Sequence, residues 1–146
     1  MTWKDYQKKG LVAAHKTSKA EIDDLRAAVE RNLKDASIEE LSDDNRFVIA
    51  YQAALLAAKI AIACAGYRVK GQGAHHTTFD VIPLALSATS RPLADYFDLC
   101  RRKRNDISYD SEGVVSTKDV EELVEKAAEF KTEVEAWISK RHPSLA

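Results

Sequence analysis

Apolar residues recur at helical spacing along most of this chain, and no sustained alternation of apolar and polar residues is present. The pattern predicts a first helical region over residues 3–34 with a break near residues 15–18. Ser18 is expected to cap the second part of this region, with Glu21 as its capping-box partner. A second helix, rich in alanine, is predicted over residues 46–65. Its candidate N-caps are Asp43, Asp44 and Asn45.

The second half of the chain shows three further helical patterns. Residues 75–88 predict a third helix that Pro83 kinks or divides, because proline lacks the N–H of a helix interior. A fourth helix is expected from a Ser90 cap to Ile107, with a proline tolerated in its first turn. Thr117 is the candidate cap of the last helix, which ends before His142-Pro143.

Together these helices predict an all-α fold, an up-and-down four-helix bundle with an additional short helix. The glycine-containing segment 66–73 and residues 109–113 are predicted to be loops. A length of 146 residues suits a single domain, expected to span residues 1–146.

The composition excludes several classes of protein. Cys64 and Cys100, the two cysteines, are too few for a disulfide framework or a four-cysteine zinc site, and we expect buried free thiols, no metal and no cofactor. The apolar segment 47–65 contains Lys59 and is mainly alanine, which favours a buried helix over a membrane span. The charged N-terminus does not resemble a signal peptide, so a cytoplasmic protein is expected.

The overall net charge of −1 conceals an uneven distribution. Residues 46–104 hold nine Lys or Arg and three Asp or Glu, a net charge of +6. Such a run is compatible with a solvated helix face, but also with phosphate binding, which depends on the local field. The candidate contacts for phosphate or nucleic acid in this region are Arg68, Lys70, His75, His76, Arg101, Arg102 and Lys103.

Arg104 occupies an unusual position on the fourth predicted helix. At 100° per residue it falls within the apolar stripe, between Phe97 and Ile107, whereas Arg102 points the opposite way. An unpaired buried guanidinium is very costly, so Arg104 needs a partner. Two interpretations stay open: contact with phosphate at a cleft, or an ion pair with one of three carboxylates, Asp80, Asp95 or Asp106.

The segment from Arg104 to Asp110 resembles the signature of HEPN domains (higher eukaryotes and prokaryotes nucleotide-binding), an Arg, often followed by Asn, with a His four to six positions later. The alanine-rich helix, the segment 73–79 and the closing helix also resemble that family. The resemblance implies a HEPN-like bundle whose candidate catalytic residues are Arg104, Asn105 and Tyr109. Here Tyr109 stands in place of the family's His, and a neutral phenol is a poor general base.

The resemblance also implies a function and partners. We expect a module that binds nucleotide or RNA in a toxin–antitoxin or defence system, as a homodimer with Arg104 at a shared phosphate-binding cleft. One alternative is an active, metal-independent endoribonuclease, in which either His75 or His76 replaces the missing imidazole. A second is a structural or regulatory partner of a minimal nucleotidyltransferase, with Tyr109 as the residue that is modified.

Overall fold

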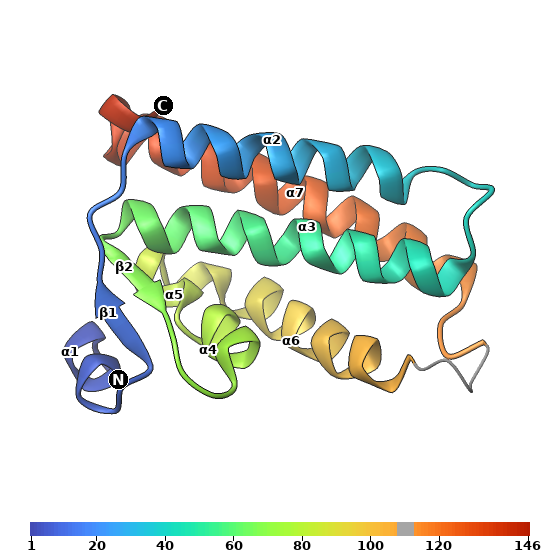
Figure 1. Ribbon diagram of the computed structural model, residues 1–146, viewed down its shortest axis with the longest axis horizontal. Helices are drawn as coiled ribbons and strands as arrows, with labels where there is room; N and C mark the ends of the chain where they lie inside the picture. Colours follow the sequence, from blue (N-terminus) through green and yellow to red (C-terminus); the bar gives the residue numbers. More distant parts are fainter. Residues whose placement is uncertain (108–112) are drawn as a thin grey trace.

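The computed structural model describes residues 1–107 and 113–146. Helices α2, α3, α6 and α7 form the bundle, and shorter helices pack at one side of it (Figure 1). This arrangement confirms the predicted all-α bundle. The helices are α1 (Trp3–Lys8), α2 (Lys19–Ala36), α3 (Asp43–Cys64), α4 (Ala74–Asp80), α5 (Ile82–Ala85), α6 (Arg91–Asp106) and α7 (Thr117–Arg141).

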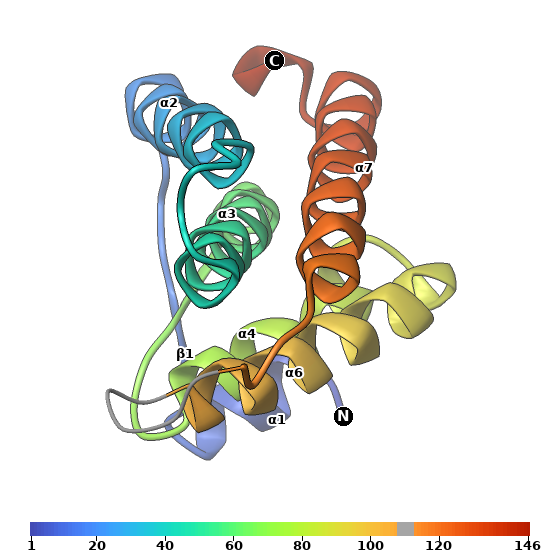
Figure 2. The ribbon, with the colours of Figure 1, turned by 90° about the vertical axis from the view of Figure 1, so that its right-hand side faces the viewer.

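Helix α3 lies at the centre of the fold. It packs against α2 and α7 along its length and against α4, α5 and α6 on its remaining side (Figures 1 and 2). Between Arg46 and Cys64, Lys59 is the only exposed residue. Helix α3 is long and apolar enough to cross a membrane, but 72% of its most apolar window is buried inside the bundle. That burial is what the core helix of a folded domain requires.

A two-stranded antiparallel sheet was missed by the sequence pattern. Strands β1 (Val12–Ala14) and β2 (Tyr67–Val69) pair with Val12 opposite Val69. The first predicted helix therefore stops at Lys8, and part of the predicted glycine-rich loop is a strand. Three residues are too few for alternation to stand out, so only tertiary pairing reveals these strands.

Two helix caps differ from the predicted ones. Ser42, not one of the three residues after it, caps α3 by accepting from the Asn45 N–H. Ser116 caps α7 in a capping box, while the Thr117 hydroxyl donates to Asp43. In each case the residue one or more positions earlier has the extended backbone that a cap requires.

Two other predicted caps form only in part. The Ser18 hydroxyl accepts from the Glu21 N–H, but the Glu21 carboxylate contacts His15 and Thr17 and forms no reciprocal capping-box bond. Ser90 precedes α6, yet its hydroxyl donates to the Ser87 carbonyl. The predicted division of the third helix is confirmed, since Pro83 lies in the first turn of α5, directly after α4.

A chain of aromatic rings joins the helices on one side of α3. Phe97 of α6 lies 5.6 Å from Phe79 and 5.2 Å from Phe130, measured between ring centroids. Phe79 in turn meets Tyr51 at 5.9 Å. All four rings are fully buried, so this chain holds α3, α4, α6 and α7 together.

Replacement of Phe97 tests this core. Phe97→Ala is expected to lower the free energy of unfolding by about 3–5 kcal/mol, because it removes a fully buried ring and leaves a cavity. Leu99→Ala, two residues away on the same helix, is the matched control: Leu99 is 60% exposed, and a change within about 0.5 kcal/mol is expected. Urea denaturation followed by circular dichroism measures both, and equal losses of stability would contradict the burial of Phe97 in the core.

Candidate functional site

Three of the four basic residues at the end of α6 have carboxylate partners. Arg101 Nε donates to Asp98 at 2.8 Å, and an Arg102 nitrogen lies 3.8 Å from the same carboxylate. Lys103 Nζ lies 3.3 Å from Asp119. These residues were predicted to contact phosphate, but part of their charge is already balanced within the protein.

Arg104 differs from its neighbours. It is half-buried, as its place within the apolar stripe predicts, and it forms no ion pair with a carboxylate of residues 1–107 or 113–146. Two of the three carboxylates considered as partners, Asp80 and Asp95, contact Arg91 instead. Among the described residues, no carboxylate therefore balances the charge of Arg104.

The other members of the predicted motif are Asn105 and Tyr109. Asn105 is exposed at the end of α6. Tyr109 lies outside the described residues.

His75 shares an electrostatic neighbourhood with Arg104. Its Nδ1 lies 3.3 Å from the hydroxyl of buried Tyr51. Partial burial of the ring, followed by the charges of Lys59, Arg104 and Arg101, lowers the pKa of His75 below 6.5. The fold thus brings together an imidazole that is mainly neutral at pH 7 and an arginine 29 positions further along the sequence.

His76 faces a different group. Its Nδ1 lies 3.1 Å from Asp98, the carboxylate that also accepts from Arg101. Burial opposes ionisation of Asp98, but the hydrogen bonds from Arg101 and His76 outweigh it and hold the pKa of this carboxyl below its ordinary value. As expected for adjacent helix residues, only one of the two histidines, His75, lies beside Tyr51.

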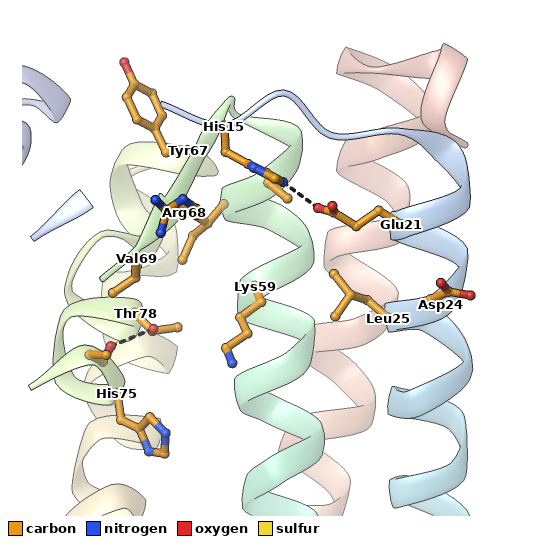
Figure 3. A pocket seen from close by; sticks show the side chains of 13 residues that line it. His15, Glu21, Asp24, Leu25, Lys59, Tyr67, Arg68, Val69, His75 and Thr78 are labelled. Carbon is orange, nitrogen blue, oxygen red and sulfur yellow. Dashed lines mark hydrogen bonds and ion pairs between the residues drawn. The ribbon is translucent and has the colours of Figure 1, made fainter. Parts of the chain in front are cut away.

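A pocket of about 510 Å³ opens across α3, between α2 on one side and β2 and α4 on the other (Figure 3). Lys59 of α3, Arg68 of β2 and His75 of α4 line it, so the pocket joins Arg68 and His75, both predicted as phosphate contacts, with the cation of Lys59. The α2 side contributes Glu21 and Asp24. The pocket therefore has a basic side and an acidic side.

The charged groups of the pocket differ in how far they are already satisfied. Glu21 accepts from Thr17 at 3.0 Å and lies 2.7 Å from His15 Nε2. In contrast, Lys59 and Arg68 are exposed and form no ion pair with any carboxylate of the described residues. These two cations are available to a ligand.

Lys59, His15 and Glu21 were missed as site residues by sequence reasoning. Lys59 was considered only as evidence against a membrane span, although a single Lys in an otherwise apolar helix was the available signal. His15 and Glu21 reach the pocket through the pairing of β1 with β2, which no local pattern indicated.

Two predicted contacts lie differently from expectation. Lys70 follows β2 and does not line the pocket. Tyr67 lines it, but its ring stacks on Trp3 with centroids 4.2 Å apart and points away from the other labelled side chains (Figure 3). One face of Tyr67 is therefore covered by the protein.

The described residues contain no cluster of three His, Cys, Asp or Glu side chains that would hold a metal ion. Cys64 and Cys100 are buried and unpaired with each other, as predicted. Burial raises the pKa of each thiol to about 11, so both stay protonated at neutral pH and are poor nucleophiles.

Comparison with known families decides the classification. The model of a HEPN-like domain family matches residues 36–135, more than half of the chain. The chain belongs to the HEPN domain family. No curated protein and no solved structure gave a significant match.

The matched part of this HEPN domain contains α3, α4, α6 and most of α7, and with them Lys59, Arg68, His75 and Arg104. The acidic side of the pocket lies outside the match, because Glu21 and Asp24 belong to α2. The pocket of this HEPN domain thus combines family residues with residues of the N-terminal segment.

The cations around His75 can be tested by titration. Lys59→Gln and Arg104→Gln are each expected to raise the pKa of His75 towards 6.5, because each removes a positive charge that disfavours the imidazolium. Lys4→Gln removes an exposed lysine of α1 and is expected to leave this pKa unchanged. NMR titration of the imidazole protons measures the shift, and an unchanged pKa in both Lys59→Gln and Arg104→Gln would contradict the arrangement.

The lowered pKa also sets the direction of a pH effect on stability. The folded protein binds a proton at His75 less readily than the unfolded chain, whose His has a pKa near 6.5. The contribution of His75 therefore favours folding fully above pH 6.5 and is lost as the pH falls through its lowered pKa. In His75→Gln, the dependence of unfolding free energy on pH in this range is expected to be weaker.

Proposed function

We propose that this HEPN domain binds RNA through the phosphate backbone, at a surface formed by Arg104, Arg101 and His75. The observation that carries the proposal is the half-buried Arg104, which has no carboxylate partner among the described residues and lies near His75. Guanidinium groups bind phosphate oxygens in a bidentate manner, and a local positive field is sufficient even in a protein of net charge −1.

The proposal includes a homodimer in which two copies of this surface meet. A half-buried arginine in an apolar stripe is tolerated where the stripe borders an open interface and the charge meets an anion. Two copies of Arg104 would double the positive field at a shared cleft. Membership in a toxin–antitoxin or defence system, and a nucleotidyltransferase partner, stay predictions from the family resemblance.

A second candidate function, RNA cleavage without a metal, is favoured by His75. At neutral pH its imidazole is mainly neutral, as a general base must be, and Arg104 lies near enough to lower its pKa. When Nδ1 donates to the Tyr51 oxygen, Nε2 carries the lone pair that accepts a proton. In this scheme Arg104 stabilises the negative charge that develops on the phosphate.

RNA binding tests the principal proposal. Arg104→Gln is expected to weaken binding of a single-stranded RNA oligonucleotide about tenfold, because it removes a charge-assisted hydrogen bond of about 1.5–3 kcal/mol. The dependence of log K on log salt concentration should also become shallower, by about 0.7 for each phosphate that the protein no longer neutralises. Fluorescence anisotropy at several salt concentrations measures both.

The control for Arg104→Gln is Arg31→Gln. Arg31 is exposed on α2, which lies on the opposite side of α3 from α6 (Figure 1). Wild-type affinity and salt dependence are expected for this variant. Equal affinities of wild-type protein, Arg104→Gln and Arg31→Gln would show that Arg104 does not contact RNA.

Cleavage and assembly are tested separately. If the protein is a ribonuclease, His75→Ala and Arg104→Ala should each abolish cleavage in the presence of EDTA, while Arg31→Gln cleaves normally. RNA that is bound but stays intact would eliminate the second candidate and leave the first standing. Light scattering at micromolar concentration is expected to give a dimer mass, and a monomer would remove the shared cleft from the proposal.

A further inference from the structure

The pocket between α2 and β2 offers a site that RNA binding at Arg104 leaves unused. Lys59 and Arg68 come from two different elements and line the same space. Lys59 is the only exposed residue of α3 from Arg46 to its end, so the core helix reaches solvent there with a cation. Two such charges in one pocket favour an anion with several oxygens.

His75 adds a third group on the same side of the pocket. In Figure 3, Lys59 and His75 lie towards one end, while His15 and Glu21 lie at the other. The imidazole is mainly neutral at pH 7, so it offers hydrogen bonding without further repulsion between cations. Lys59, Arg68 and His75 together form the basic side of the pocket, which is suited to phosphate oxygens.

The opposite side has the chemistry to bind the remainder of a ligand. Asp24 is exposed and forms no ion pair with any base of the described residues, so its carboxylate is free to accept hydrogen bonds from a ligand. Leu25, Ile62 and Val69 add apolar surface to the lining of the pocket. A space of about 510 Å³ exceeds what an inorganic anion fills and falls within the range of small-molecule sites.

We propose that this pocket binds a phosphate monoester carried on a ring-bearing body of nucleotide size. Lys59 and Arg68 bind the phosphate, the apolar residues cover the ring, and Asp24 accepts from its amino or hydroxyl groups. The site goes beyond the proposed RNA surface, because only His75 belongs to both. The monoester has two sources with the same chemistry, a free nucleotide or the 5′-phosphorylated end of an RNA.

Isothermal titration with nucleoside 5′-monophosphates tests the site directly. Binding is expected to weaken at least tenfold for the nucleoside without phosphate, and about tenfold in Lys59→Gln and in Arg68→Gln. Lys4→Gln, which removes an exposed lysine of α1 away from the pocket, is expected to bind as the wild type does. Circular dichroism confirms that each variant is folded, as expected for exposed positions.

RNA oligonucleotides with a 5′-phosphate or a 5′-hydroxyl distinguish the two sources. Tighter binding of the phosphorylated RNA by wild-type protein, absent in Lys59→Gln, assigns the pocket to the RNA end. Binding of the monophosphate with no effect of the RNA 5′-phosphate assigns it to a free nucleotide. The proposal is overturned if Lys59→Gln and Arg68→Gln bind both the monophosphate and the 5′-phosphorylated RNA as tightly as the wild type does.

The same experiment separates this site from the proposed RNA surface. Arg104→Gln is expected to weaken binding of 5′-hydroxyl RNA and to leave monophosphate binding unchanged. Lys59→Gln and Arg68→Gln are expected to weaken monophosphate binding and to leave binding of 5′-hydroxyl RNA unchanged. If no variant binds RNA more weakly than the wild type, but monophosphate binding still depends on Lys59, the RNA surface is rejected and the pocket is retained.

Discussion

Helix α3 has almost no surface of its own, and this constraint organises the rest of the protein. From Arg46 to Cys64 its residues are buried or half-buried except Lys59, so every side of the helix needs a covering element. Helices α2 and α7 cover it along its length, and the remaining side is left to shorter elements and α6. The many alanines allow these neighbours to approach closely, while aromatic rings fill the wider space beside α6.

The same constraint determines where ligand chemistry is available. Because α4, α5 and β2 are short, they cover the last side of α3 incompletely, and the pocket opens where α3 carries Lys59. His75 lines this pocket, and its pKa is lowered first by burial and then by the charges of Lys59, Arg104 and Arg101. Three cations that come from α3 and α6 therefore act on one imidazole.

Local carboxylates decide which basic residues remain available. The sequence shows four consecutive basic residues, and a charge count treats them as equal. In the fold, Asp98 accepts from Arg101 and lies near Arg102, and Asp119 of α7 contacts Lys103. Asp98 is on the same helix, so its pairing follows from spacing of three and four residues, whereas the Asp119 contact requires α7 to pack beside α6. Arg104 differs from these three residues because it forms no ion pair with a carboxylate of the described residues.

Sequence alone determined the number and type of the long helices, the division at Pro83 and the burial of the alanine-rich segment, because these follow from periodicity and from backbone chemistry within a few residues. The half-burial of Arg104 also followed from its helical angle. Tertiary structure decided three further features. These are the pairing of β1 with β2, the effect of the Arg104 charge on His75, and the shared pocket of Glu21 and Asp24 with Lys59 and Arg68. Each of these unites residues more than 25 positions apart, and such contacts depend on how the elements pack around α3, which no local pattern encodes.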